Sequence, residues 1–248
     1  MKEPRKLGWV VDAGLLPYGP ACELQRQLVE ARKAGSIPDV LLLCEHPHVI
    51  TLGRNGIREH LRAGDRLLEQ MNVEFHPTDR GGDITYHGPG QIVGYPILDL
   101  NEHRRDVRWY VARLEEVMIC ASADFGVTAK RVEGRHGVWI ETASGEEKLG
   151  ALGVHLSRWV TSHGFAYNVS TDLRYFDLIV PCGIAGTRAT SLERVLNRSM
   201  DCGEVRARLA SHFADVFQLL LEHVTREDLA RIPGSRQKTS AGALTAMV

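Results

Sequence analysis

The sequence lacks the features that are typical of membrane proteins, of secreted proteins and of proteins with a structural zinc site. No segment approaches the roughly 18 consecutive apolar residues of a membrane-spanning helix, and residues 1–19 contain no apolar run long enough for a signal peptide. The five cysteines form no CxxC pair, which disfavours both a disulfide framework and a structural zinc site. The sequence therefore predicts a cytoplasmic protein in a reducing compartment, with no membrane partner.

An excess of charge of either sign is also lacking. The 248 residues include 30 Lys and Arg against 31 Asp and Glu, which gives a formal net charge of −1. Nonspecific nucleic-acid binding depends on excess positive charge that meets phosphates, so no nucleic-acid partner is expected. Hydrophobic residues make up 44% and charged residues 25% of the chain, as in an ordinary globular protein.

Hydrophobic periodicity predicts three amphipathic helices and a set of short strands. Apolar residues recur at helical spacing over 20–34, 106–124 and 203–222. Short apolar or alternating segments, separated by turn residues, predict strands over 7–12, 40–44, 83–87, 91–98, 136–141, 148–156 and 159–168. Because several spacings are of hairpin length, neighbouring strands are expected to be antiparallel. The expected fold class is α/β of the α+β type, with a mixed, mostly antiparallel sheet flanked by helices.

The domain organisation is expected to be simple. No linker interrupts 7–224, so residues 1–232 are predicted to form a single catalytic domain. The tail over 233–248 is small, polar and aperiodic, which predicts disorder.

A glycine-rich segment, RGGDITYHGPGQ over 80–91, is the first candidate for chemistry. Glycine lets the backbone approach a ligand closely, and Arg80, Thr85, Tyr86 and His87 place polar groups beside these points. The pattern is neither GxGxxG nor a P-loop, so no dinucleotide or nucleotide fingerprint is present. A tight hairpin without a ligand is the alternative interpretation.

Three further segments offer reactive groups beside small residues. Lys148 opens the segment KLGALG, where burial would lower the pKa of a lysine, although a lysine on an exposed strand edge is common. The segment HGFAYN over 163–168 places small residues at a strand end. Cys182, in PCGIAGTRATSL, lies between proline and glycine and outside any periodic element, which suits either a nucleophile on a loop or a filler residue. The other four cysteines, Cys22, Cys44, Cys120 and Cys202, fit buried filler.

His46 and His48 flank Pro47 and are weak candidates for a metal site. They would need a third ligand on the same face, and no HExxH motif or cysteine pair accompanies them. Polar histidines that are hydrogen-bonded near a turn are therefore the favoured interpretation.

Taken together, the segments RGGDITYHGPGQ, KLGALGVHLSRWVTSHGFAYNV and PCGIAGTRATSL, with HPHVITLGRNG upstream, resemble the lipoyl(octanoyl) transferases, also called lipoate-protein ligase B. The resemblance covers roughly 7–222 and keeps the motifs in order. It implies the catalytic fold of the biotin- and lipoate-protein ligases. His48 stands where family members often have another residue, and the tail has no clear family counterpart.

The resemblance also implies an activity. Such an enzyme moves an octanoyl group from an acyl carrier protein thioester to a lysine of a lipoyl domain, through an acyl-thioester on a cysteine. Octanoyl-acyl carrier protein is then the donor, and the acceptors are lipoyl domains of 2-oxoacid dehydrogenase complexes and the glycine cleavage H protein. No metal and no organic cofactor is implied.

By motif match, the nucleophile is Cys182 and its partner is Lys148. Lys148 would favour the thiolate as a cation and later, as a neutral amine, accept the proton of the incoming lysine. The matching acyl-binding residues are Arg80, Gly81, Gly82, Asp83, Ile84, Thr85, Tyr86, His87, Ala151, Leu152, Gly153, Gly164, Phe165 and Ala166. Among these, the glycines and alanines would leave gaps for the chain, with Leu152 and Phe165 as wall.

Two other functions are compatible with parts of the sequence. One is an ATP-dependent ligase of the lipoate or biotin type on the same fold, which needs no cysteine nucleophile, so that the PCGI segment argues against it. The other is a non-catalytic module that only binds an acylated carrier domain, against which the Cys and Lys argue.

Overall fold

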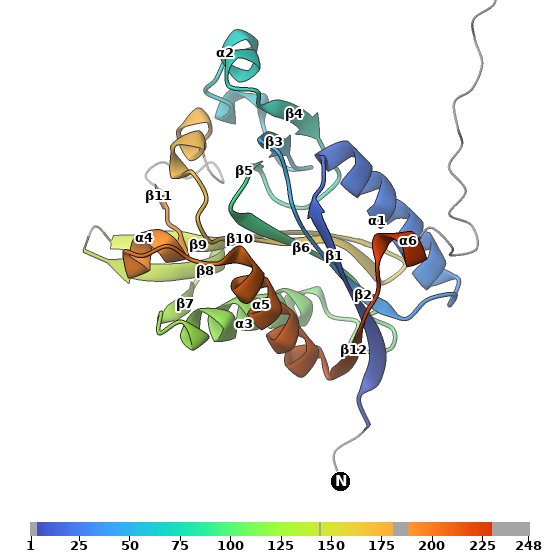
Figure 1. Cartoon of the computed structure of the whole chain (residues 1–248). Coiled ribbons are helices and arrows are strands. Elements are labelled where there is room, and N and C mark those ends of the chain that lie inside the picture. Colours follow the sequence, from blue (N-terminus) through green and yellow to red (C-terminus); the bar gives the residue numbers. More distant parts are fainter. Residues whose placement is uncertain (1–3, 144, 181–187, 230–248) are drawn as a thin grey trace, which may run out of the picture.

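A long mixed sheet organises the computed structural model, which describes residues 4–143, 145–180 and 188–229 (Figure 1). Its strands lie in the order β12-β1-β2-β6-β10-β9-β8-β7, and β11 pairs with β9 off this path. The bounds are β1 Lys6–Leu15, β2 Asp39–Glu45, β6 Gln91–Ile97, β7 Ala129–Val132, β8 Arg135–Thr142, β9 Gly145–Ser157, β10 Val160–Asn168, β11 Arg188–Ala189 and β12 Leu219–His223. The pairs β12–β1, β1–β2 and β11–β9 are parallel and the other pairs are antiparallel, so the predicted fold class is confirmed.

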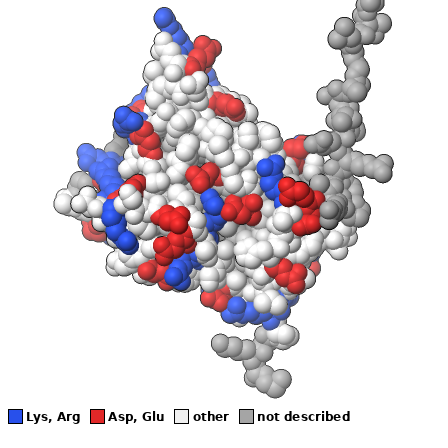
Figure 2. Space-filling view, in the orientation of Figure 1, with Lys and Arg blue, Asp and Glu red and all other residues white. Residues whose placement is uncertain are grey.

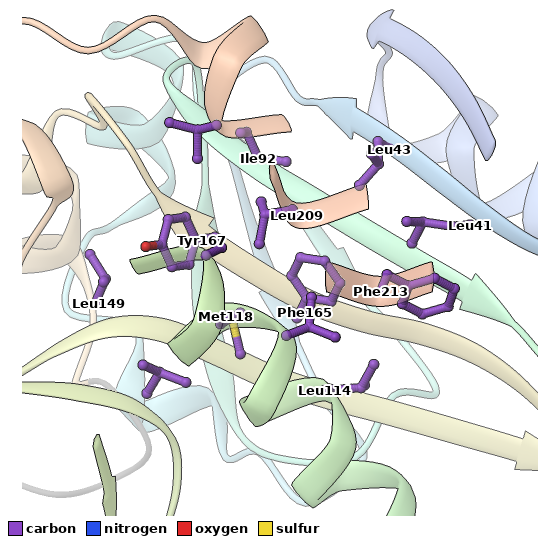
Figure 3. Packing of buried hydrophobic residues seen from close by; sticks show 14 of the residues in the cluster. Leu41, Leu43, Ile92, Leu114, Met118, Leu149, Phe165, Tyr167, Leu209 and Phe213 are labelled. Atoms are coloured by element: carbon purple, nitrogen blue, oxygen red, sulfur yellow. The ribbon is translucent and has the colours of Figure 1, made fainter. Parts of the chain in front are cut away.

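Helices cover both faces of this sheet. Helix α1, Tyr18–Lys33, lies on one face, and helices α3, Val107–Asp124, and α5, Cys202–Phe217, lie on the other (Figure 1). Strand β2 shows the division, because alternate side chains point to opposite faces. Leu41 and Leu43 pack with α3 and α5 (Figure 3), while Leu42 packs with α1. The core therefore forms two layers of side chains on either side of one sheet.

A second, three-stranded sheet lies beside the main sheet and contributes to the candidate site described below. It has the order β4-β3-β5, and a third apolar cluster joins it to the short helices around it. The bounds are β3 Val49–Leu52, β4 Glu74–Pro77, β5 Ile84–His87, α2 Asp65–Gln70, and the 3₁₀ helices η1 Arg58–His60 and η2 Leu173–Leu178. Helices α4, Leu192–Leu196, and α6, Arg226–Leu229, complete the described elements.

One predicted helix is wrong at its C-terminal end. The helix expected over 203–222 ends at Phe217, and Leu219–His223 forms strand β12. Gln218 adopts a left-handed conformation, with φ of 57°, which ends the helix. The apolar residues that follow continue the helical spacing by chance, but they hydrogen-bond to the edge of the sheet at β1.

Other expectations have mixed outcomes. The helices over 20–34 and 106–124 match α1 and α3 closely. No helix in the described part of the chain is long and apolar enough to cross a membrane. The four cysteines within the described residues are all free thiols; Cys44 is buried as expected, but Cys22, Cys120 and Cys202 are only partly buried. The predicted disordered tail over 233–248 lies outside the described residues, and the single domain stays a prediction.

Candidate active site

An inner pocket opens where strands β9 and β10 carry their smallest side chains. Gly153 and Ala151 of β9 pair in register with Gly164 and Ala166 of β10, so the four positions face the same side of the sheet. The pocket is open at its mouth, and the space inside it together with the solvent at the mouth amounts to about 520 Å³. Of the predicted acyl-binding residues, those that line it are Arg80, Gly82, Asp83, Ile84, Thr85, His87, Ala151, Leu152, Gly153, Gly164, Phe165 and Ala166.

Close packing explains why these positions need small residues. A Cβ at Gly164 would lie 2.3 Å from the carbonyl oxygen of Gly94, and a Cβ at Gly153 would lie 3.0 Å from Cδ of Arg80. Gly164 thus lets β10 lie close to β6, and Gly153 lets the Arg80–Gly82 loop approach β9, to which the loop is tied by a hydrogen bond from Gly81 N–H to the Val154 carbonyl, 2.8 Å. This loop forms one wall of the pocket.

The side chains of Leu152 and Phe165 lie on the opposite face of the sheet. They are cross-strand partners, and Phe165 packs among the side chains of α3 and α5, as Figure 3 shows. Leu152 packs against the same cluster while still bordering the pocket. Both residues still line the pocket, and further apolar wall comes from Val93, Tyr95 and Tyr18, none of which the sequence analysis selected.

Arg80 is held by a dense set of hydrogen bonds. Its side chain is buried, Nε and Nη2 donate to Thr51 Oγ1 at 3.1 and 2.8 Å, and Nη2 also donates to the Thr51 carbonyl at 2.7 Å. Thr51 belongs to β3, so Arg80 ties the glycine-rich loop to the small sheet. The result is a rigid positive group beside the inner pocket.

Two buried histidines lie near the pocket as neutral groups. His87 lines the pocket and donates from Nδ1 to Gln91 Oε1, 2.7 Å, and burial lowers its pKa to about 3. His46 donates from Nδ1 to the Leu16 carbonyl, 2.6 Å, and accepts from the Tyr95 hydroxyl, 2.7 Å, while burial lowers its pKa to about 4. The predicted role of His46 as a hydrogen-bonded polar histidine is confirmed.

Of the predicted residues 80–87, Tyr86 lines neither the inner pocket nor the outer cleft that is described below. Tyr86 stacks on Tyr175, with ring centroids 5.0 Å apart, and its hydroxyl meets Nδ1 of His48 at 2.7 Å. Tyr86 therefore supports β5 from behind, and His48 is hydrogen-bonded as predicted. No group of three His, Cys, Asp or Glu side chains in the described part of the chain is arranged to hold a metal ion.

An outer cleft adjoins the inner pocket and contains Lys148. The two spaces share Gly82, Asp83, Leu152 and Gly153 in their walls. The outer cleft adds Gly81 of the predicted set, together with His60, His136, Trp139 and the α3 residues Val107 and Val111. The inner pocket and the cleft that contains Lys148 are therefore direct neighbours.

A bulge in β9 sets the direction of Lys148. Trp139 pairs with Lys148 and Val138 with Gly150, so Leu149 is the extra residue. Val138 and Leu149 pack in the core with α3, whereas Nζ of Lys148 lies 4.6 Å from the centroid of the Trp139 ring. Lys148 thus points into the cleft across an aromatic surface, which favours a cation.

Cys182 lies outside the described residues, but the chain on both sides of its segment is anchored at the outer cleft. Val180 N–H donates to the His60 carbonyl, 2.7 Å. At the other end, Arg188 and Ala189 pair with Glu147 and Lys148. The segment that contains Cys182 therefore leaves the described structure beside His60 and returns beside Lys148.

The sequence analysis missed several residues of the two spaces. Tyr95 lies in the strand predicted over 91–98 and Tyr18 lies just before the helix predicted over 20–34, and periodicity could not separate a pocket wall from a packed core. His163 was within one of the candidate segments; it borders the inner pocket and binds Asp79 through Nε2, 2.8 Å. His60 lies in a 3₁₀ turn without any motif.

Sequence comparisons with known proteins identify the family of the chain. Residues 17–214 match the family model of the lipoyl protein ligase A/B catalytic domain. A protein of Solibacter usitatus named octanoyltransferase is 54% identical over 82% of this chain and 90% of its own length. Another octanoyltransferase, from Koribacter versatilis, is 47% identical over 90% of this chain and 93% of its own.

Solved structures agree at the level of the fold. A bipartite lipoate protein ligase of Thermoplasma acidophilum, studied with its E2 lipoyl domain, has a TM-score of 0.72 at 16% identity and covers 91% of both chains. A lipoate-protein ligase A bound with ATP has a TM-score of 0.69 at 15% identity, over 92% of this chain and 93% of that one.

Proposed function

Because the chain belongs to the octanoyltransferases of the lipoyl protein ligase A/B family, an enzyme family, we propose that it transfers an octanoyl group from acyl carrier protein to a lysine of lipoyl domains through a thioester on Cys182. The observation that carries this proposal is the adjacency of the two spaces. An inner pocket walled by small residues meets, at Gly82 and Gly153, a cleft that contains Lys148.

The inner pocket suits an acyl chain. Burial of each methylene contributes roughly 0.8 kcal/mol, so an eight-carbon chain gains about 5 kcal/mol in a dry slot. Ala151, Gly153, Gly164 and Ala166 leave the slot open along one face of the sheet. The neutral state of His87 lets an apolar chain lie against it without a buried charge, since burial holds its pKa at about 3.

The reaction needs a cysteine that is ionised part of the time. A free thiol has a pKa of about 8.5, so only a few per cent is thiolate near neutral pH. An ammonium nearby favours the thiolate, and Lys148 supplies that charge at the cleft. The thiolate attacks the donor thioester and displaces the phosphopantetheine thiol, after which the acceptor amine attacks the acyl-enzyme and displaces Cys182.

The proposed partners are acyl carrier protein as donor and lipoyl domains of 2-oxoacid dehydrogenase complexes and of the glycine cleavage H protein as acceptors. A reducing, cytoplasmic compartment belongs to the same proposal, since the thiol must stay free. Acidic and basic side chains alternate on the visible surface (Figure 2), in line with the net charge of −1. The Thermoplasma acidophilum ligase belongs to a lipoylation system that includes an E2 lipoyl domain, which supports the acceptor class.

Intact-mass analysis tests the intermediate. The full chain is incubated with octanoyl-acyl carrier protein in the absence of ATP, and a single octanoyl adduct is expected, which a lipoyl domain then removes. Cys182→Ala is expected to lose the adduct, whereas Cys120→Ala, a partly buried cysteine of α3, is expected to keep it.

Lys148→Ala is expected to slow adduct formation by about 100-fold, because the Cys182 thiolate loses the ammonium that favours it. Lys130→Ala, in which an exposed lysine paired with Glu141 is removed, serves as the matched control. An adduct on Cys182→Ala, or activity that requires ATP, would contradict the proposal and favour a ligase.

A further inference from the structure

A third space adjoins the inner pocket, between α1 and the hairpin end of β9 and β10. Its walls include Gln25 and Val29 of α1, His155 of β9 and Ser162 of β10. We call this space the rear groove; together with the solvent at its mouth it amounts to about 710 Å³. His163 lines both the rear groove and the inner pocket, and among the described residues no other does so. The side chain of His163 therefore lies on the boundary between the two spaces.

The backbone turns His163 toward this boundary. In the strand register His163 pairs with Val154, which packs with the core of α3 and α5, so regular alternation would point His163 to that face as well. His163 instead has a left-handed φ of 54°, which is uncommon for residues other than glycine. Its ring centroid lies 6.4 Å from that of Tyr95, which packs on the α1 face. A strained backbone that redirects one side chain points to a specific task for that side chain.

Contacts with three different elements hold His163 in place. Its N–H donates to Oε1 of Gln25 on α1 at 2.8 Å, and its Nε2 donates to Oδ1 of Asp79 at 2.8 Å. Its ring meets the ring of Tyr95 on β6 edge to face. Only 8% of the His163 side chain is exposed. The ring is therefore a fixed partition, since a chain that pushed it aside would have to break these contacts.

Strand β9 runs past all three spaces. Lys148 lies in the outer cleft, Gly153 lines the inner pocket and His155 lines the rear groove. Under the proposed function the acyl group enters from the outer cleft, because that cleft shares four wall residues with the inner pocket. The tail of the chain then points away from the cleft. A tail too long for the inner pocket meets His163, beyond which the rear groove continues.

We propose that His163 closes the inner pocket behind an eight-carbon chain and thereby selects the length of the acyl group; this inference rests on the function proposed above. His163 takes no part in bond exchange, so it determines specificity without being a catalytic residue. Longer fatty acyl chains are excluded by its ring, although further space lies behind it. Removal of the ring is accordingly expected to join the inner pocket to the rear groove.

Donor competition tests this role. Octanoyl- and dodecanoyl-acyl carrier protein are supplied together, and the ratio of the two products on a lipoyl domain is measured by mass. His163→Gly removes the ring and supplies a residue that accepts a left-handed backbone. The product ratio is expected to shift by about 10-fold toward dodecanoyl. A dry slot would give a larger shift for four more methylenes, but the rear groove is open to solvent.

The competition format protects the test against partial unfolding. Both donors compete for the same enzyme molecules, so the product ratio does not depend on how much of the variant is folded. His163→Asn provides a second reading, since asparagine is smaller and also tolerates a left-handed backbone. It is expected to shift the ratio in the same direction by a smaller factor.

Two further variants separate entry into the rear groove from a general loosening of the inner pocket. Ser162→Phe fills the rear groove from β10, where an aromatic residue suits a strand. Added to His163→Gly, it is expected to return the product ratio to within about threefold of the wild type. His212→Ala is the matched histidine control, because His212 contacts Asp124 at 2.8 Å outside all three spaces. It is expected to leave the ratio unchanged.

The outcomes distinguish this inference from the proposed function. If His163→Gly and His163→Asn transfer octanoyl chains with the wild-type preference, His163 does not select chain length. A shift toward dodecanoyl that Ser162→Phe fails to reverse also overturns the role of His163 as a partition. A wild type that transfers neither chain from acyl carrier protein overturns the proposed function itself.

Discussion

Ala151 and Ala166 are neighbours on the same side of the sheet in the wall of the inner pocket, and under the proposed function their small side chains set how long a chain can enter. Ala151→Val adds two carbons at a strand position that tolerates a β-branched residue. We expect the specificity constant for octanoyl donors to fall by about 15-fold, since two displaced methylenes cost about 1.6 kcal/mol, while hexanoyl donors lose little. Donor competition, with products separated by mass, measures the ratio. An equal loss for both chain lengths would count against this chain-binding role.

His46 and His87 predict an acid-dependent loss of stability. Burial lowers their pKa values to about 4 and about 3, whereas an unfolded histidine titrates near 6.5. Below pH 6.5 the unfolded chain takes up these protons and the folded chain does not. The free energy of unfolding is therefore highest above pH 6.5 and falls as the pH drops, by about 1.4 kcal/mol per pH unit for each histidine.

Urea unfolding between pH 7 and 4.5 measures this slope, in a window above the titration of most carboxyl groups. His46→Gln is expected to reduce the slope by about half. A free energy of unfolding that stays constant across the window would contradict the assignment of two buried neutral histidines.

The glycines and reactive side chains of the motifs identified more of the candidate site than the periodicity of apolar residues did. Arg80, Asp83 and Lys148 stand in motifs whose glycines and reactive groups are visible in the sequence, and these residues do gather around two adjoining spaces. Tyr95 and His60 could not be found in this way. Their positions depend on long-range pairing, of β6 with β2 and β10 for Tyr95 and of Val180 with His60 for His60, which no local pattern encodes.

Elements with strong local signals were predictable, and elements defined by a partner were not. Helix α3 has an apolar stripe and an N-cap, Asp106, whose side chain accepts from Trp109 N–H. By contrast, β11 has two residues and exists only because it pairs with β9. Strand β12 shows the same limit. The apolar spacing over Leu219–His223 fits a helix, but the segment forms a strand because it pairs with the edge of the sheet at β1. The direction of pairing in the small sheet was equally hidden.

At the scale of the whole molecule, a buried ion cluster joins the layers on the two sides of the sheet. Arg32 of α1 contacts Asp39 of β2 at 2.9 Å, and His103, just before α3, contacts the other oxygen of Asp39 at 2.6 Å. Despite burial, contacts with His103 and Arg32 lower the pKa of Asp39. Asp39 thus fixes one helix from each face to the sheet.

Asp39→Asn is expected to lower the free energy of unfolding by about 3 kcal/mol, because it removes the buried carboxylate that Arg32 and His103 both contact. Asp12→Asn removes an exposed carboxylate that pairs with Arg206 and is expected to change stability by less than about 1 kcal/mol. Urea unfolding at pH 7 compares the two variants. Equal losses of unfolding free energy in the two variants would show that the buried cluster stabilises the fold no more than an ordinary surface ion pair does.

Strand β9 carries Lys148 at one end and the alanine and glycine of the chain slot a few residues later, without a loop between them. Under the proposed function, the backbone of β9 therefore fixes the distance between Lys148 and the slot for the acyl chain. Evolution toward a longer or shorter fatty acid in this scaffold must proceed by trading side-chain bulk along the slot, since lengthening the strand would misplace the amine as well.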